Sequence, residues 1–586
     1  MEKLRYRTSF SYTDMQWILR GSEYQRLTGR LNLDNEVTKW LTLSSGISIS
    51  YDQRRNLTEQ DVYSGTVFSS LAADPITPVY RDNLVDIPDF MSGRIMDGYE
   101  PTNPWSRYTG VLYSNKPNTV AQADRNALLK MKDYQTKANV SADVKLFPFL
   151  TFKSSIALDL RRREWNGFAP KYYLDGDEKE TDAYVNVSHY NTDYWVFDNY
   201  LTFNKTFDRH TVNAMAGTSA EKTRFEAVTA TKAGMVNNEK SQQILNAGTK
   251  NPGASGYVTI NSLNSYFGRV FYSYDNKYMV TGNIRWDGSS RFPKGNRWGV
   301  FPSISGGWNF SEESFLKNTD WLYQGKLRAG WGQIGNQETW NAVYQNTFAN
   351  SGYYIFGSSN DYYLSGLRNQ VGNPDLTWEK TSQLDIGLDL AFLKGSLRAT
   401  FDYFERKTSD MLIQLPLPQS LGLPNTPWVN AGSVRNRGVE LSIAYDGKAG
   451  KDFAYHINGN ISTYRNEVTD LKGSTIGGTG VHLGYFNYTM TEEGEPIGYF
   501  YGYKTDGVFQ TQAEIDNYVN NGSVVMPNAK PGDLKYKDLN KDGSIGEEDR
   551  TMIGNPHPDF TFGLTLGAEY KNFDFTLFFP GSIGND

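Results

Sequence analysis

Hydrophobic and polar residues alternate along this chain with a period of two. The pattern is clearest over residues 384–392, where one face is wholly apolar and the other carries Asp385, Gly387 and Asp389. After a short turn, the alternation resumes over residues 397–403. Because successive side chains of a strand point to opposite faces, this pattern predicts a β-hairpin.

Three other regions repeat the pattern. It predicts hairpins that join 27–33 to 41–51 across a turn at 35–39, 266–274 to 278–286, and 562–570 to 573–579. Each run is about 9 to 11 residues long, the length that crosses a bilayer at a tilt, whereas strands of soluble proteins are usually about 5 to 6 residues long. The alternation therefore predicts an all-β protein, a transmembrane antiparallel β-barrel whose apolar faces contact lipid and whose polar faces line the lumen. A large soluble β-sandwich or propeller is the alternative.

Connections between the predicted strands differ in size. Short turns are predicted at Asp208-Arg209, Asp275-Asn276, Lys394-Gly395 and Lys571-Asn572. Long polar connections are predicted at about 52–132, 161–192, 333–377 and 465–559, and a short helix is predicted within the first of them, at 61–73. Short periplasmic turns opposite long extracellular loops are typical of outer-membrane barrels.

Composition supports strands rather than membrane helices. Hydrophobic residues make up 38% of the 586 residues, the mean hydropathy is -0.57, and no run of about 18 apolar residues occurs. Aromatic residues reach 14%, as expected for a barrel with aromatic girdles. The net charge of -6 comes without a basic block, so nucleic acid is not expected as a partner.

Residues 538–549 match a calcium-binding loop. Asp538, Asn540, Asp542 and Asp549 stand at loop positions 1, 3, 5 and 12, and Ser544 stands at position 7, where the backbone carbonyl is the ligand. A Gly follows at position 6, where the loop bends sharply, but position 12 is Asp where Glu is usual. We expect a structural Ca²⁺ that stiffens a long loop, and a polar turn without metal is the alternative.

No other motif indicates chemistry. The sequence Gly330-Trp-Gly-Gln-Ile-Gly335 matches a dinucleotide-binding pattern, but no helix or βαβ unit follows, so it is interpreted as a glycine-rich strand end. The five histidines are scattered and the chain has no cysteine, which leaves catalytic zinc and thiolate sites without support. The protein is not predicted to be an enzyme.

Aromatic residues gather in the connection 340–370 among Asn, Ser and Gly. Exposed aromatic rings among amides and hydroxyls suit stacking on sugars or gripping a peptide. The candidate substrate-binding residues are Trp340, Tyr353, Tyr354, Tyr362 and Tyr363. An aromatic loop that packs on itself is the alternative for each of them.

Several segments closely resemble the SusC/RagA family of TonB-dependent outer-membrane transporters of Bacteroidetes. They are 266–269, 287–292, 297–303, 335–337, 373–379, 434–441, 496–507 and 532–556, which include Tyr-Phe-Gly-Arg, Asp-Gly-Ser-Ser-Arg-Phe, Asn-Pro-Asp-Leu-Thr-Trp-Glu and the calcium-type loop. The resemblance implies a 22-stranded barrel with a plugged lumen in the outer membrane of a Gram-negative cell.

The resemblance also implies partners: a SusD-like lipoprotein that lids the barrel, and the TonB–ExbB–ExbD system acting through a plug. It implies TonB-dependent uptake of oligosaccharides or peptides, with a passive porin-like channel and a soluble carbohydrate-binding β-protein as alternatives. We find no signal peptide, TonB box or plug sequence before Glu2, and the chain stops at Asp586 before the expected last strands. The expectation is therefore a partial barrel domain, 1–586, of a longer transporter.

Overall fold

The computed structural model describes residues 4–55, 66–80, 108–109, 118–126, 128–174, 179–317, 319–339, 343–355, 362–414, 420, 426–478 and 488–586. Seventeen strands in this part of the chain belong to one sheet. They are β1 (Leu4–Gln16), β2 (Glu23–Thr38), β3 (Leu41–Arg55), β4 (Lys130–Phe147), β5 (Leu150–Ala169), β8 (Tyr184–Phe207), β9 (His210–Ala233), β10 (Lys250–Tyr274), β11 (Tyr278–Ser289), β12 (Trp298–Trp308), β13 (Leu322–Asn336), β16 (Glu379–Phe392), β17 (Leu397–Ser409), β20 (Ser433–Ala449), β21 (Phe453–Asp470), β30 (Phe560–Tyr570) and β31 (Phe573–Ile583). The predicted all-β class is confirmed.

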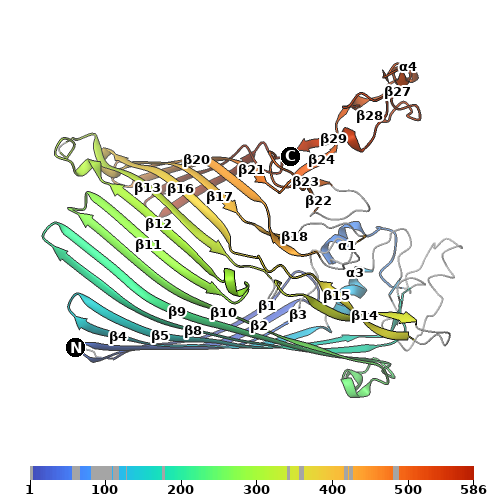
Figure 1. Ribbon diagram of the computed structural model, residues 1–586, viewed down its shortest axis with the longest axis horizontal. Helices are drawn as coiled ribbons and strands as arrows, with labels where there is room; N and C mark the ends of the chain where they lie inside the picture. The colour runs from blue at the N-terminus through green and yellow to red at the C-terminus, as the bar shows by residue number, and fades with distance from the viewer. Residues whose placement is uncertain are drawn as a thin grey trace. The chain divides into compact units, whose positions relative to one another are not determined.

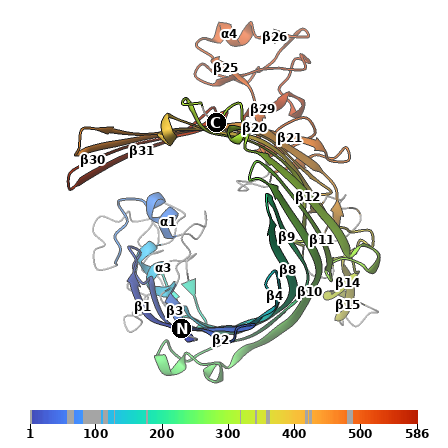
Figure 2. The same cartoon turned by 90° about the vertical axis from the view of Figure 1, so that its left-hand side faces the viewer.

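The chain falls into two compact units, and the first comprises Met1–Leu201 with Gly217–Asn264. Here β1 to β5 pair in chain order, each strand antiparallel to the next. Two short helices, α1 (Thr66–Ala72) and α3 (Thr119–Asn126), lie beside β1 and β3 (Figure 2). Arg20, in the β1–β2 turn, forms an ion pair of 2.8 Å with Asp124 of α3. The short strands β6 (Tyr172–Tyr173) and β7 (Lys179–Glu180) also pair.

The second unit comprises Thr202–Ala216 with Ser265–Asp586. Its strands β11, β12, β13, β16, β17, β20, β21, β30 and β31 pair antiparallel in that order. Figure 1 shows β11 to β13, β16 and β17 side by side, and Figure 2 shows β30 beside β31. Smaller sheets join β14 (Thr347–Ile355) to β15 (Tyr362–Gln370), β18 (Leu412–Gln414) to β19 (Trp428–Asn430), and β22 (Ile476–Gly477), β23 (Thr489–Thr491), β24 (Tyr499–Tyr503) and β29 (Arg550–Gly554) to one another.

A further group of elements, which we call the loop module (residues 499–554), projects from the ends of the long strands of the second unit, and its helix α4 lies well away from them in both views (Figures 1 and 2). It adds β25 (Thr505–Val508), α4 (Gln512–Asp516), β26 (Val519–Asn520), β27 (Ser523–Val524) and β28 (Leu534–Tyr536) to β24 and β29. Short 3₁₀ turns occur at Lys240–Gln242, Leu245–Ala247, Lys294–Asn296, Phe310–Glu312, Leu393–Gly395 and Glu547–Asp549. Among the described residues, no helix is long and apolar enough to cross a membrane.

The apolar face of the sheet in the second unit is exposed rather than packed. Registers align one cross-strand row of apolar residues over six strands: Leu327, Leu388, Phe401, Leu441, Ile461 and Phe562. Phe401 and Ile461 are 45% and 42% exposed. Such a row would be costly in water, because contiguous apolar surface is favoured only against an apolar medium. The arrangement is that of a strand wall facing hydrocarbon, as the alternation predicts.

Buried apolar residues form small clusters near strand ends. One cluster joins Phe168, Ala183, Val185 and Met235 in the first unit, and another joins Val434, Val468 and Leu471 in the second. The loop module has its own buried residues, including Phe509, Ile515 and Val525. These clusters fix the connections to the ends of the strands, while strand pairing holds the wall itself.

The predicted short turns are confirmed. β10 and β11 are joined through Asp275 and Asn276, which have φ of 53° and 54°, the left-handed conformation that a tight hairpin turn of this hand needs. The turn predicted at 35–39 is shorter than expected, since β2 runs to Thr38 and β3 begins at Leu41. The Thr38 hydroxyl accepts a hydrogen bond from the Leu41 N–H at 3.0 Å, and this bond closes a turn of two residues between β2 and β3.

Strand lengths correct the sequence prediction. Strands β8, β9 and β10 have 24, 24 and 25 residues, against the expected 9 to 11. Pairing continues beyond the apolar part of the strands, because polar side chains tolerate an extended backbone equally well. As a result, β5 reaches Ala169 and β8 starts at Tyr184, so both long strands extend into the connection predicted at 161–192. Helix α1 lies within the predicted 61–73, of which 61–65 fall outside the described residues.

Candidate functional site

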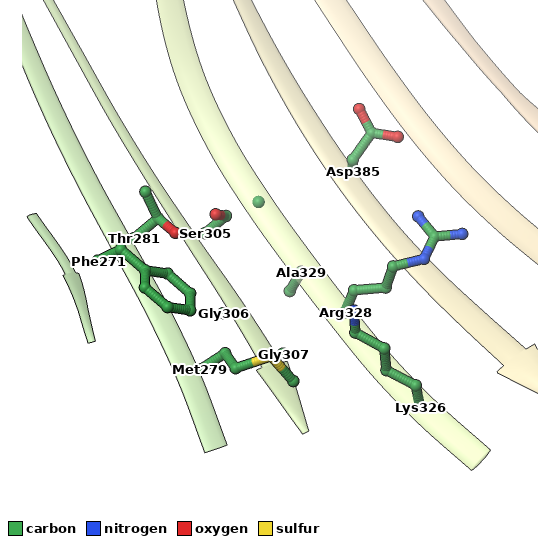
Figure 3. Close-up of a pocket in the computed structure, with 11 residues that line it drawn as sticks. Phe271, Met279, Thr281, Ser305, Gly306, Gly307, Lys326, Arg328, Ala329 and Asp385 are labelled. Carbon is green, nitrogen blue, oxygen red and sulfur yellow. The ribbon is translucent and has the colours of Figure 1, made fainter. Parts of the chain in front are cut away.

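The polar face of β10 to β16 in the second unit carries a groove. One cavity of about 360 Å³ lies against Phe271, Met279, Ser305, Lys326 and Arg328. Figure 3 shows Phe271 and Met279 on one side and the cationic side chains of Lys326 and Arg328 on the other. An adjoining cavity of about 320 Å³ shares Ser305 with the first. Together they form one groove along the sheet, lined by polar and charged side chains as well as apolar ones.

Glycines make this groove possible. Gly330 lies opposite Ser305 and Gly332 lies opposite Ser303 in the β12–β13 register. A Cβ at Gly332 would come within 2.8 Å of the Ser303 Cβ, so a side chain there would fill the floor of the groove. The segment 330–335 is part of β13, which confirms its interpretation as a glycine-rich strand.

Arg328 lies flat across the neighbouring strand. Its Nε donates to Asp389 on β16 at 2.8 Å, and its Nη2 lies 2.8 Å from an Oδ of Asp402 on β17. The side chain reaches Asp402 by passing over Gly387, the residue between them in the register. A Cβ at Gly387 would collide with the guanidinium of Arg328 and the carboxylate of Asp402.

The groove therefore combines a fixed guanidinium with hydroxyl and carboxylate groups. Ser303 accepts a hydrogen bond from the Asn283 amide at 3.0 Å, and Asp385 accepts one from the Gln383 amide at 2.5 Å. Polar groups held in place along an open depression can bind hydrophilic solutes by exchangeable hydrogen bonds. Among the described residues that line the groove, none is arranged as a nucleophile with an adjacent base.

The calcium-type loop is closed by its own carboxylates. Asp538 accepts the N–H of Asp542 at 3.2 Å and of Gly543 at 2.9 Å. The side-chain amide oxygen of Asn540 accepts the Asp542 N–H at 2.9 Å. Gly543 has φ of 94°, and a Cβ there would lie 2.7 Å from the backbone oxygen of Asn520, so glycine is required at this bend.

Asp549 has a different role. Its side chain is fully buried, and its two oxygens accept backbone N–H groups from Leu539 at 2.7 Å and Gly546 at 2.8 Å. The two ends of the loop are thus tied together through this carboxylate. Across the described chain, no three His, Asp or Glu side chains are arranged as a metal cluster. The donors of the loop are all oxygens, the type that Ca²⁺ prefers, and they include an amide and a backbone carbonyl besides carboxylates.

Charges around this loop are ordered. The Asn540 amide and the Ser544 hydroxyl and N–H donate to Asp542 and lower the pKa of its carboxyl group. Nearby, Asp506 on β25 lies 3.4 Å from Lys537 and 3.5 Å from Lys535. The charge of Lys537 is the largest cause that lowers the pKa of Asp506. Both carboxylates are therefore charged at neutral pH.

The candidate substrate residues are only partly placed. Trp340 lies outside the described residues. Tyr353 and Tyr354 belong to β14, Tyr362 and Tyr363 belong to β15, and Tyr354 pairs with Tyr363 in the register. The hairpin brings the four backbone positions together, and their side chains lie outside the description. Sequence reasoning treated this segment as a loop, and the paired aromatic positions were the available signal for two strands.

The sequence patterns did not predict two other features. The glycine-floored groove requires residues from five strands, and alternation within each strand gives no information on which strands are neighbours. The connection between β17 and β20 was not predicted as long, although it contains β18 and β19. Its prolines were the available signal for a long connection.

The long antiparallel strands agree with a known family of β-barrel proteins. Residues 74–579 match the family model described as TonB dependent receptor-like, beta-barrel. The chain belongs to this family.

Known relatives agree with this assignment. The chain is 31% identical over 622 residues to TonB-dependent receptor P39 of Formosa agariphila, covering 100% of this chain and 55% of that protein. It is 30% identical over 597 residues to TonB-dependent receptor SusC of Bacteroides thetaiotaomicron, covering 100% of this chain and 56% of that protein. The chain thus spans about half the length of the curated relatives it matches.

Solved structures show the same fold. A structure of the RagAB peptide transporter superposes with a TM-score of 0.76 at 20% identity, covering 100% of this chain and 60% of that one. The RagAB peptide importer in the open-open state gives 0.78 at 22% identity, with coverage of 100% and 60%. The resemblance to the SusC/RagA family is confirmed.

Proposed function

We propose that this chain forms the barrel part of a TonB-dependent importer in the outer membrane of a Gram-negative cell. The observation that carries the proposal is the opposite character of the two faces of the same strands. In the second unit, one face presents exposed apolar rows and the other presents the polar groove with Arg328. A wall of this kind separates hydrocarbon from a wet interior. Membership of the TonB-dependent receptor family supports transport that takes its energy from TonB.

The proposed cargo is an oligosaccharide or a peptide, taken up with a SusD-like lipoprotein and driven by the TonB–ExbB–ExbD system through a plug. Family membership and the likeness to SusC support this cargo class. The groove supports a hydrophilic solute, since hydroxyl, amide and charged groups line it. No covalent chemistry is part of the proposal.

Gene deletion tests the proposal. In the source bacterium, loss of the whole gene should abolish growth on one class of oligosaccharide or peptide, and the intact gene should restore it. Removal of TonB should have the same effect on uptake of that solute. Uptake that persists without TonB would instead indicate a passive porin-like channel.

Extraction distinguishes the soluble alternative. A barrel with exposed apolar rows should remain in the outer-membrane fraction after high-salt and carbonate washes and enter solution with detergent. Recovery of the whole protein in the wash without detergent would support a soluble carbohydrate-binding β-protein.

We also propose that Asp538, Asn540, Asp542 and the Ser544 carbonyl bind a structural Ca²⁺, with Asp549 closing the loop. The ion would offset two of the three negative charges of Asp538, Asp542 and Asp549 and stiffen the loop module. The bend at Gly543 and the inward hydrogen bonds of Asp538 support this assignment.

A further inference from the structure

A second cavity lies at one end of the apolar wall in the second unit. It has a volume of about 580 Å³ and lies against β17, β20 and β21 on one side and segments 495–496 and 552–559 on the other. Tyr403, Arg437 and Arg465 line it from the strands. Its position differs from that of the groove, whose residues come from β10 to β16.

The strand registers show which face carries these residues. Tyr403 pairs with Val439, which pairs with Thr463. Two residues along, Glu405 pairs with Arg437, which pairs with Arg465. Because side chains two apart share a face, Arg437 and Arg465 lie on the same face as the exposed apolar row that contains Phe401, Leu441 and Ile461.

The cluster is basic. The next row on this face contains Lys407, Arg435 and Glu467, in that order. The two charged rows together hold four cations and two carboxylates, Glu405 and Glu467. Arg435 forms an ion pair of 2.9 Å with Glu467, and the charge of Glu467 also attracts Arg437 and Arg465 at longer range. Arg437 and Arg465 lie directly opposite each other, and neither forms a hydrogen bond or a close ion pair with a described residue. Glu495 and Asp559 line the cavity from the loop side.

Two guanidinium groups opposite each other on a strand pair repel. Glu405, opposite Arg437, and Glu467, which attracts both arginines, offset part of this repulsion, and an anion bound between the two guanidinium groups would offset more of it. The pair stands immediately beyond the apolar band, beside Tyr403, whose ring suits a membrane interface. Head-group phosphates lie at that level of a bilayer, and guanidinium groups bind phosphate oxygens in a bidentate manner. The acyl chains of the lipid would lie along the exposed apolar row that contains Phe401, Leu441 and Ile461.

We propose that Arg437 and Arg465 form a binding site for the phosphate of an anionic membrane lipid. The cavity receives the head group, the apolar wall receives the acyl chains, and the lipid neutralises the charge repulsion between β20 and β21. The site rests on the barrel wall and is independent of the imported solute.

Native mass spectrometry of the whole protein in neutral detergent tests this proposal, with phosphatidic acid as the anionic probe and a diacylglycerol as the neutral one. The R437Q/R465Q variant should bind phosphatidic acid about thirtyfold more weakly, which corresponds to about 2 kcal/mol for two cations near a membrane surface. Its weak binding of diacylglycerol should equal that of the wild type.

The control R398Q/K448Q removes two cations from the opposite face of β17 and β20 and should retain wild-type lipid binding. Circular dichroism and heat-dependent gel mobility verify that each variant is folded. Equal phosphatidic acid binding by both double variants would overturn the proposal. Competition by millimolar inorganic phosphate that fully displaces the lipid would also overturn it, because the site would then select free phosphate rather than a lipid.

Discussion

At the residue scale, the polar face of the second unit depends on glycines, because a residue without a side chain leaves space for its neighbours. Arg328 reaches Asp402 because Gly387 leaves the path open, and the floor of the groove exists because Gly330 and Gly332 lie opposite serines. A guanidinium between two carboxylates ties three strands together with charge-assisted hydrogen bonds, which are stronger than neutral ones. Glycine in a strand is costly by itself, so its use here indicates a requirement for close approach.

Gly387→Ala should therefore displace Arg328 from Asp402. The added methyl group overpacks the crossing point and should lower the free energy of unfolding by about 1–3 kcal/mol. Urea unfolding of the protein in detergent, followed by tryptophan fluorescence, measures the change. Gly282→Ala is the matched control, since a Cβ at that strand glycine meets no atom within 4 Å. Identical midpoints for the two variants would contradict the crossing-point argument.

At the element scale, the loop module is held by two kinds of carboxylate. Asp549 is buried and bonds backbone N–H groups at both ends of the calcium-type loop, so it stabilises the loop with or without metal. Asp542 is exposed and bonds Asn540 and Ser544 within the loop, so its main contribution would come through Ca²⁺.

The two residues predict different responses to calcium. Asp542→Ala should abolish the calcium-dependent protection of residues 530–556 from protease and leave the calcium-free digestion rate near that of the wild type. Asp549→Ala should raise the digestion rate both with and without calcium. Removal of the buried carboxylate leaves its backbone N–H partners unsatisfied, at a cost of about 1–3 kcal/mol each. If the wild type is digested at the same rate with calcium and with chelator, Ca²⁺ does not stabilise this loop.

At the scale of the whole molecule, the strand wall requires two different solvents. Leu441 belongs to the exposed apolar row, whereas its neighbour Ser442 points to the polar face with Thr400 and Asn460. Hydrocarbon outside and water inside satisfy both faces without a packed core beneath the sheet. This explains why buried apolar residues gather in small clusters at the strand ends.

An arginine introduced on either face should report this difference. Leu441→Arg should destabilise the protein folded in lipid bilayers by about 2–4 kcal/mol, the cost of a cation deep on a lipid-facing position. Ser442→Arg, one residue away, should cost far less because its side chain stays in water. Reversible urea unfolding from vesicles compares the two. Equal costs would mean that the row with Phe401 and Ile461 does not face hydrocarbon.

The sequence by itself determined the β class, the hairpins and their short turns, because alternation and turn chemistry are local properties of the chain. It also determined the spacing of the calcium-type loop. The tertiary structure decided how far the strands continue, that β14 and β15 pair, and which residues meet across strands. The Arg328 crossing, the groove and the opposed Arg437 and Arg465 all depend on register. Register relates segments far apart in the chain, and no local pattern encodes it.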